Sequence, residues 1–122
     1  MLFVGAKQEF GQQAVPVAKS ATATLTIAEL LTGLIVTSGT AAQSYTLPTG
    51  VLGDAGITAP ALPINGYFDW GLINTGTGSG AVTMVAGTAH TIVGSTAVAI
   101  ATSAGFRTRK TALTTFVTYR IR

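Results

Sequence analysis

His90 is the only histidine of the 122-residue chain, and histidine is the side chain most often used for acid–base catalysis and metal binding. Both roles need partners, because a metal site collects several ligands and a catalytic imidazole is oriented by a carboxylate or a second base. The nearest acidic residue in the sequence is Asp69, twenty-one positions earlier. We therefore expect His90 to be a structural residue of a strand, and we predict no catalytic residue, no metal site and no cofactor.

A glycine-rich segment, Gly76–Gly80 (GTGSG), has the glycine content of a phosphate-binding loop. Such a loop holds phosphate at the N-terminus of the helix that follows it. Here the following residues, Ala81–Val85, are strand-like, and the sequence contains no Gly-Lys-Ser/Thr. We interpret the segment as a hairpin turn in which glycine supplies positive φ angles.

The four carboxylates are dispersed, and each has a structural interpretation. Glu9 falls in the N-terminal segment, and Glu29 follows Thr26 by three residues, which is the capping-box pattern at the start of a helix. Asp54 lies in a glycine-flanked turn, and Asp69 is expected on the face of a strand opposite the core, where it can pair with a C-terminal arginine. The spacing does not exclude a glycosidase-like pair, but no feature favours an enzyme.

The basic residues are concentrated near the C-terminus. Residues 61–122 carry five basic residues and one acidic residue, a net charge of +4, whereas residues 1–60 have a net charge of −1. A basic cluster can bind nucleic acid or an acidic protein surface, but no aromatic stacking pattern is interleaved with this one. We therefore favour solvated strand edges or a protein partner over nucleic acid. The residues expected to contact a partner protein or another subunit are Lys7, Phe10, Lys19, Arg107, Arg109, Lys110, Arg120 and Arg122.

Charge is scarce in the rest of the chain. Charged residues make up 9% of the sequence, against about 25% in an average soluble domain, and the stretch from Trp70 to Phe106 has none. Glycines interrupt that stretch, which predicts short strands and turns rather than a membrane helix. The absence of cysteine excludes disulfides and fits synthesis in a reducing cytoplasm. Because a charge-poor β surface favours association, we expect a permanent homo-oligomer.

The clearest strand is Gly66–Asn74, which places Phe68, Trp70 and Leu72 on one face as anchors of the core. Further short strands follow at intervals typical of a sandwich or barrel. The other predicted strands are Ala21–Leu25, Leu34–Thr37, Ser44–Leu47, Ala81–Val85, His90–Val93, Thr96–Ala101, Gly105–Lys110 and Thr115–Ile121.

These patterns predict an all-β fold: an antiparallel sandwich or jelly-roll-like barrel with one short helix. The helical turn is expected to follow Thr26 and to end at Gly33. The segment from Thr49 to Asn65 is rich in proline and glycine and is expected to be irregular. Residues 1–20 are expected to form an extended N-terminal arm, and residues 21–122 a single β domain.

The most distinctive motif is Phe68–Gly76 (FDWGLINTG), followed by the V-T…G…V-G pattern of Ala81–Gly94. Together with the stretches named below, these motifs span roughly residues 25–120, and on them the chain resembles small β-rich structural proteins of tailed bacteriophages. None of the motifs is catalytic, so the resemblance is architectural. The remaining stretches are Leu25–Gly33, Tyr45–Thr49, Gly105–Arg109 and Val117–Arg120.

The resemblance implies a virion protein that is made in the host cytoplasm and decorates or cements the capsid exterior. It implies a homo-oligomer, most often a trimer, in contact with the major capsid protein. The alternative is a tail or fibre module that binds a receptor or glycan, for which Tyr67, Asp69 and Trp70 are the candidate residues. The segment Met1–Lys19 departs from the shared pattern, and we expect it to grip the capsid or to lace subunits together.

Overall fold

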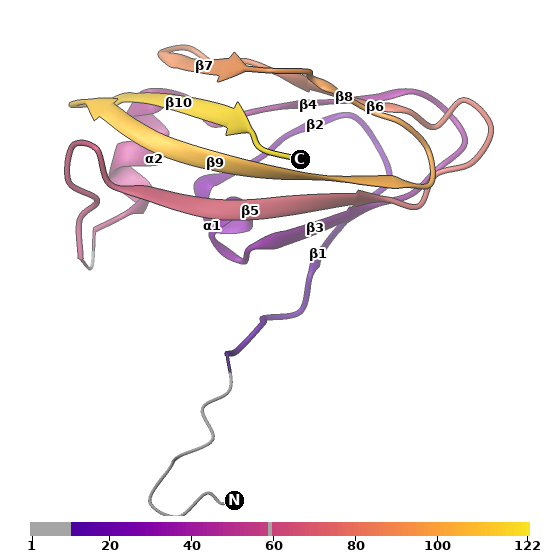
Figure 1. Ribbon diagram of the computed structural model, residues 1–122, viewed down its shortest axis with the longest axis horizontal. Coiled ribbons are helices and arrows are strands. Elements are labelled where there is room, and N and C mark those ends of the chain that lie inside the picture. The colour runs from indigo at the N-terminus through magenta and orange to yellow at the C-terminus, as the bar shows by residue number, and fades with distance from the viewer. Residues whose placement is uncertain (1–10, 59) are drawn as a thin grey trace, which may run out of the picture.

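The computed structural model describes residues 11–58 and 60–122, and in this part of the chain it contains ten strands and two helices (Figure 1). The regular structure is therefore mostly β, as the sequence predicts. Lys7 and Phe10, two of the residues expected to contact a partner, lie outside the described residues. The elements are β1 (Val17–Lys19), β2 (Ala23–Thr24), α1 (Ile27–Leu31), β3 (Leu34–Thr37), β4 (Gln43–Thr46), α2 (Gly50–Gly56), β5 (Tyr67–Asn74), β6 (Val82–Val85), β7 (His90–Val93), β8 (Ala97–Val98), β9 (Thr102–Ala112) and β10 (Thr115–Arg120).

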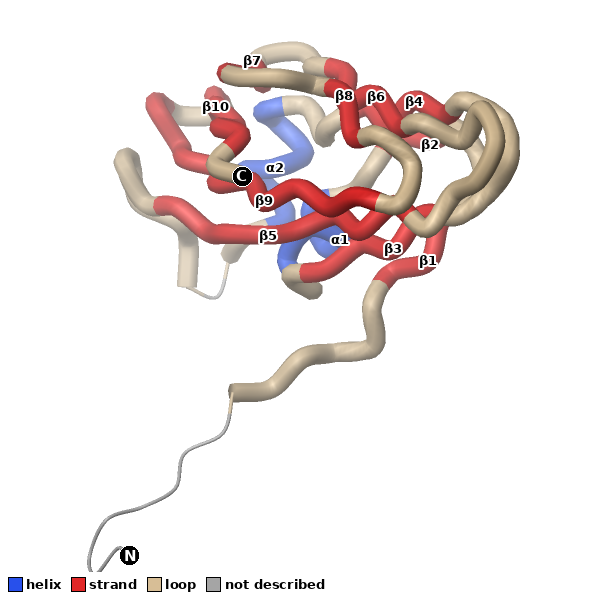
Figure 2. The backbone as a smooth tube through the Cα atoms, turned by 45° about the vertical axis from the view of Figure 1, so that its right-hand side comes forward, coloured by secondary structure: helices blue, strands red, loops and turns tan. Residues whose placement is uncertain are grey.

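The strands form two sheets that the chain visits in alternation. The large sheet has the strand order β1-β3-β5-β9-β10-β7, and the small sheet has the order β2-β4-β6-β8. Each of the strands β1 to β8 is followed by a strand of the other sheet, and the tube in Figure 2 passes back and forth between the two layers. Among the described strands, only β9 and β10 are consecutive in one sheet, where they form an antiparallel hairpin.

The prediction of a purely antiparallel arrangement is wrong, because both sheets are mixed. The strands β1, β3 and β5 are parallel neighbours, as are β2, β4 and β6, and β7 runs parallel to β10. A chain that passes through the other sheet before it returns can arrive in its original direction, and this passage is the crossover that parallel pairing requires. The segment Gly76–Gly80 is such a connection between β5 and β6, not the predicted hairpin turn.

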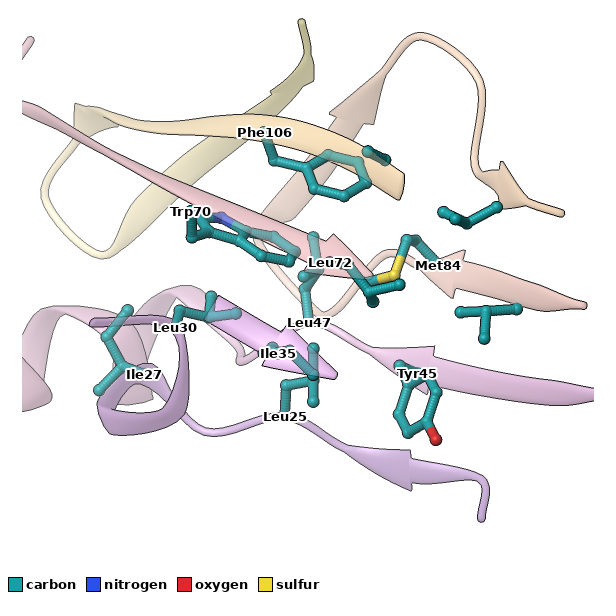
Figure 3. Close-up of a cluster of buried hydrophobic side chains, with 13 residues drawn as sticks. Leu25, Ile27, Leu30, Ile35, Tyr45, Leu47, Trp70, Leu72, Met84 and Phe106 are labelled. Atoms are coloured by element: carbon teal, nitrogen blue, oxygen red, sulfur yellow. The ribbon is translucent and has the colours of Figure 1, made fainter. Parts of the chain in front are cut away.

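The core lies between the sheets and draws side chains from both of them (Figure 3). Trp70 of β5 stacks on Phe106 of β9, with ring centroids 4.5 Å apart and ring planes at 24°. Of the three residues expected to anchor the core, Trp70 and Leu72 are buried, and Phe68 is partly buried against the same cluster. A large apolar side chain that is fully buried contributes about 1.5–3 kcal/mol by leaving water. The small sheet contributes Tyr45, Val82, Met84 and Val98.

Helix α1 begins and ends as predicted. The hydroxyl of Thr26 accepts a bond from the backbone N–H of Glu29 (3.2 Å), and the Glu29 carboxylate accepts one from the Thr26 N–H (2.9 Å), so the capping box is confirmed. Gly33 follows the helix with φ of +89°, the left-handed conformation that ends many helices. Ile27 and Leu30 turn the helix towards the core.

Helix α2 corrects two predictions, since the segment after Thr49 is not entirely irregular and the fold has more than one helix. Its three glycines allow close packing instead of breaking the helix. A Cβ added at Gly50 would lie 1.9 Å from the carbonyl oxygen of Thr114, and one added at Gly56 would lie 1.9 Å from Ile27 of α1. The helix therefore fits tightly against the β9–β10 turn and α1, and these tertiary contacts override the low helix propensity of glycine.

The N-terminal part of the described chain joins the large sheet. Strand β1, which covers residues 17–19 of the segment expected to be an arm, pairs in parallel with β3 at the sheet edge. Residues 11–16 are exposed and lead away from the sheets (Figure 1). Among the described residues, no helix is both long enough and apolar enough to cross a membrane.

Candidate docking surface on the large sheet

Strand β9 divides its basic residues between the two faces of the large sheet. Its even-numbered residues 104–110 are buried, whereas Arg107 and Arg109 are partly exposed on the outer face. Arg122, which follows β10, lies over Gly105 on this same outer face. We call Arg107, Arg109 and Arg122 the arginine row.

Arg107 makes a bidentate ion pair with Asp69, which lies opposite it on β5. Its Nε is 2.7 Å from Oδ1 and its Nη2 is 2.9 Å from Oδ2, so the prediction that Asp69 pairs with a C-terminal arginine is confirmed. The guanidinium also lies 4.1 Å from the ring centroid of Tyr67, within cation–π range. The hydrogen bond from Arg107 lowers the pKa of Asp69, so this carboxylate stays ionised to a lower pH than a free aspartate.

Arg109 is held by two neutral partners. Its Nε and Nη2 donate to the hydroxyl of Tyr119 at 3.1 and 2.7 Å, and its Nη1 donates to Oδ1 of Asn65 at 2.8 Å. Tyr119 belongs to β10 and Asn65 to the loop before β5, so two other segments of the chain hold this guanidinium in place. Among the described residues, Arg109 has no carboxylate within ion-pair distance.

The absence of a side chain at Gly105 makes room for Arg122. Gly71 and Gly105 are cross-strand partners, and a hollow of roughly 250 Å³ lies over them on the outer face. A Cβ at Gly105 would lie 2.5 Å from Nη2 of Arg122, whereas a Cβ at Gly71 would make ordinary contacts. After the hydrogen bond from Arg107, the charge of Arg122 also helps to lower the pKa of Asp69. Arg122 therefore belongs to the same electrostatic cluster.

The other described residues that were expected to contact a partner make contacts inside the domain. Lys110 is only 7% exposed, and its ammonium group pairs with Asp54 of α2. Lys19 pairs with Glu29 at 2.6 Å. Arg120 donates to backbone carbonyls of β8 and of the loop before it. Each of these side chains joins two elements, and the buried Lys110 is not free to bind a partner.

The basic residues near the C-terminus contain a signal that the sequence analysis did not use. Arg107 and Arg109 are two positions apart and share a face of the strand, while Lys110 has the opposite parity and points inward. The alternation of side chains along a strand is thus sufficient to place Arg107 and Arg109 on one face and Lys110 on the other. Asn65 and Tyr119 carry no comparable signal, because their approach to Arg109 depends on strand pairing between distant segments.

His90 ends a chain of hydrogen bonds that crosses the inner face of the large sheet. Trp70 donates to Thr108 at 3.0 Å, and the hydroxyls of Thr108 and Thr118 are 2.8 Å apart. His90 is 2% exposed, with Nε2 2.6 Å from the Thr118 hydroxyl and Nδ1 2.9 Å from the carbonyl oxygen of Pro48. Both ring nitrogens thus have partners within the fold, and burial lowers the pKa of the imidazole.

The chemistry that the outer face supports is the binding of anions. Guanidinium groups present several N–H donors in one plane, which suits carboxylates and phosphates. Within residues 11–58 and 60–122, no three His, Cys, Asp or Glu side chains gather as they would to hold a metal ion.

Comparisons of this chain with protein-family models, with curated proteins and with solved structures found no match. The candidate site therefore rests on the geometry and charge of the arginine row.

Proposed function

We propose that this protein is a structural component of a tailed-bacteriophage virion that decorates or cements the capsid exterior. It would bridge subunits of the major capsid protein as a homo-oligomer, with a trimer as the expected state. The observation that carries the proposal is the arginine row, a positively charged surface formed by Arg107 and Arg109 of the eleven-residue strand β9 and by Arg122 after β10. Such a surface suits contact with an acidic protein face, because complementary charge speeds association and fixes orientation.

Strand β9, which carries Arg107 and Arg109 of the arginine row, is firmly held. β9 pairs with β5 along residues 102–109 and with β10 along residues 106–112. Since the surface is ordered before binding, little conformational entropy is lost on contact with a partner. A protein that reinforces a shell also gains strength when several such surfaces bind at once, as in an oligomer that bridges neighbouring subunits.

Exposed apolar side chains at one end of the molecule support the oligomer. Val51 and Leu52 of α2 are 62% and 61% exposed, and Leu113 in the β9–β10 turn is 71% exposed. The helix lies directly against this turn, as the close approach of Gly50 to Thr114 requires. Apolar side chains that gather at the surface mark interaction sites, and we assign these to contacts between copies of the chain.

The fold and the N-terminal segment fit this role. We assign the two facing sheets to the β-sandwich type, with a winding path in place of the hairpins of a regular jelly roll. We assign the segment before β1 to an arm that grips the capsid or laces subunits together, since residues 11–16 are exposed and lead away from the sheets (Figure 1).

The alternative of a receptor- or glycan-binding module has less support. Of its three candidate residues, Trp70 is only 3% exposed. Tyr67 is 54% exposed, but the Arg107 guanidinium covers one face of its ring. Asp69 is bound to the same arginine. An aromatic ring stacks on a sugar through a free face, and this surface offers only the other face of Tyr67.

Co-sedimentation with intact capsids of the encoding phage tests the proposal. The purified protein is mixed with capsids at increasing concentration, the capsids are pelleted, and the bound protein is quantified per capsid. The proposal expects saturation at a fixed copy number that is a simple multiple of the number of capsid subunits. A control protein of similar mass and charge sets the background, and binding no greater than that background contradicts the proposal.

A further inference from the structure

We propose that the arginine row binds an extended acidic segment of a partner protein in which Asp or Glu occupies alternate positions. The inference rests on the proposed function, because it names the chemistry of the capsid surface that this face would meet. Arg107 and Arg109 are two residues apart on one strand, and alternate residues of a strand are separated by about 6.6–6.8 Å. Side chains at alternate positions of an extended segment have the same repeat, so its carboxylates can face successive guanidinium groups.

The arginine row keeps free donors for such a ligand. The Asp69 carboxylate accepts hydrogen bonds from Nε and Nη2 of Arg107, so Nη1 remains available to donate to a ligand. Each nitrogen of the Arg109 guanidinium donates one hydrogen bond, Nε and Nη2 to Tyr119 and Nη1 to Asn65. Nη1 and Nη2 each retain one further hydrogen that a ligand can accept. Since both of these partners are neutral, the full charge of Arg109 remains to attract an anion.

The local charge balance favours an acidic partner over a second copy of this chain. The face has three guanidinium groups and one carboxylate, Asp69, so its side chains have a net charge of +2. Two copies of this face would repel each other. Each side-chain carboxylate of the described residues is already paired with a lysine or arginine of its own chain, so none of these side chains is left to neutralise the row of a neighbouring copy.

The aromatic residues of this face favour a protein segment over single-stranded nucleic acid. Proteins that bind single strands stack bases on exposed rings. Here the Arg107 guanidinium covers one face of the Tyr67 ring. The ring centroid of Tyr119 lies 5.7 Å from the guanidinium carbon of Arg109, which also donates a hydrogen bond to the Tyr119 hydroxyl through Nη2. The rings thus hold the arginines in place, and the bidentate pair with Asp69 shows that the face accepts a carboxylate.

The test is a fluorescence titration of the full chain with a labelled peptide that alternates Glu and Thr. A matched peptide with Gln in place of Glu and a single-stranded oligonucleotide of equal charge are titrated in parallel. We expect the Glu peptide to bind at least about tenfold more tightly than the Gln peptide at low salt, and we expect this difference to shrink as salt screens the charges. Equal affinity for the two peptides, or tighter binding of the oligonucleotide, overturns the inference.

Two matched variants locate the binding. Arg109→Gln removes one charge from the row, and we expect it to weaken binding of the Glu peptide at least about fivefold. Lys19→Gln removes the same charge from a lysine of β1, at the edge of the large sheet, whose ammonium group pairs with Glu29, and we expect less than a twofold change. Equal weakening by both variants would show that only net charge matters and would overturn the inference. Thermal melts confirm that both variants are folded.

The outcomes also separate this inference from the proposed function. If capsids bind the protein but the Glu peptide does not, the inference is wrong and the capsid contact lies on another surface. If the Glu peptide binds at the arginine row but capsids do not, the inference holds and the acidic partner is not the capsid.

Discussion

The Nε2 atom of His90 lies 2.6 Å from the hydroxyl oxygen of Thr118, and this contact joins the neighbouring strands β7 and β10 on the inner face of the large sheet. The donor and acceptor of each hydrogen bond in this series follow from the groups at its two ends, the Trp70 N–H and the Pro48 carbonyl. The Pro48 carbonyl can only accept, so Nδ1 carries the proton and Nε2 accepts from Thr118. Thr118 must then accept from Thr108, which itself accepts from Trp70.

The first prediction concerns pH. Burial lowers the pKa of His90 from its usual 6.5 in the folded protein, so the unfolded chain binds a proton more readily than the folded chain. The stability that the neutral imidazole contributes is therefore fully present above about pH 6.5 and is lost as the pH falls towards the folded-state pKa. Urea unfolding at several pH values between 7.5 and 5 measures this slope. His90→Gln should flatten it, and an equal slope in the variant would assign the effect to other groups.

The second prediction concerns Thr108, in the middle of the series of hydrogen bonds that runs from Trp70 to His90. Thr108→Val keeps the shape of the side chain but leaves the Trp70 N–H without an acceptor and the Thr118 hydroxyl without a donor. We expect the free energy of unfolding to fall by about 1–3 kcal/mol, the usual cost of a buried unsatisfied polar group. Thr83→Val, at an exposed position of β6, is the control and should change stability by less than about 0.5 kcal/mol. Similar values for the two variants would contradict the hydrogen-bond chain.

The third prediction compares two ion pairs. The Lys110 side chain is 8% exposed and Asp54 is 27% exposed, whereas Arg107 and Asp69 are 42% and 52% exposed. Asp54→Asn leaves a buried ammonium group unpaired and should cost about 2–3 kcal/mol, somewhat below a fully buried pair. Asp69→Asn should cost less than about 1 kcal/mol, because water screens that pair. Chemical denaturation measures both values, and the reverse order would contradict the assigned roles.

The fourth prediction concerns the proposed homo-oligomer. Static light scattering at micromolar concentration should give a mass that is a multiple of 12.3 kDa. Leu113→Glu places a charge among the exposed apolar residues beside α2 and should shift the mass towards the monomer, because an unpaired charge is costly to bury. Val93→Glu, on the exposed side of β7, is the control and should leave the mass unchanged. A monomeric wild-type protein would contradict the oligomer.

The sequence predicts individual strands better than their arrangement. Leu34–Thr37 and His90–Val93 are found with the bounds expected for them, and Trp70 points inward with Leu72, as the period of two along the strand predicts. Alternation shows which side chains are buried, but it does not show in which sheet a strand lies. The turn residues after β3 and β5 are equally compatible with a hairpin and with a passage to the other sheet, and the parallel pairing was therefore missed.

The candidate site shows the same limit. The sequence places Arg107 and Arg109 on one strand, but the approach of Asn65 and the position of Arg122 over Gly105 depend on contacts between distant segments. Helix α2 was missed because glycine is a poor helix former on its own. Gly50 suits this helix because the carbonyl group of Thr114 occupies the space where a Cβ would lie. This contact joins distant parts of the sequence, so no local pattern predicts it.

The proposed function is tested most directly by a cryo-electron microscopy map of capsids saturated with the purified protein. We expect ordered density on the outside of the shell at a fixed number of copies, with the outer face of the large sheet against the capsid and the arginine row next to carboxylates. A shell without added density, or bound protein whose arginine row faces solvent, would contradict it.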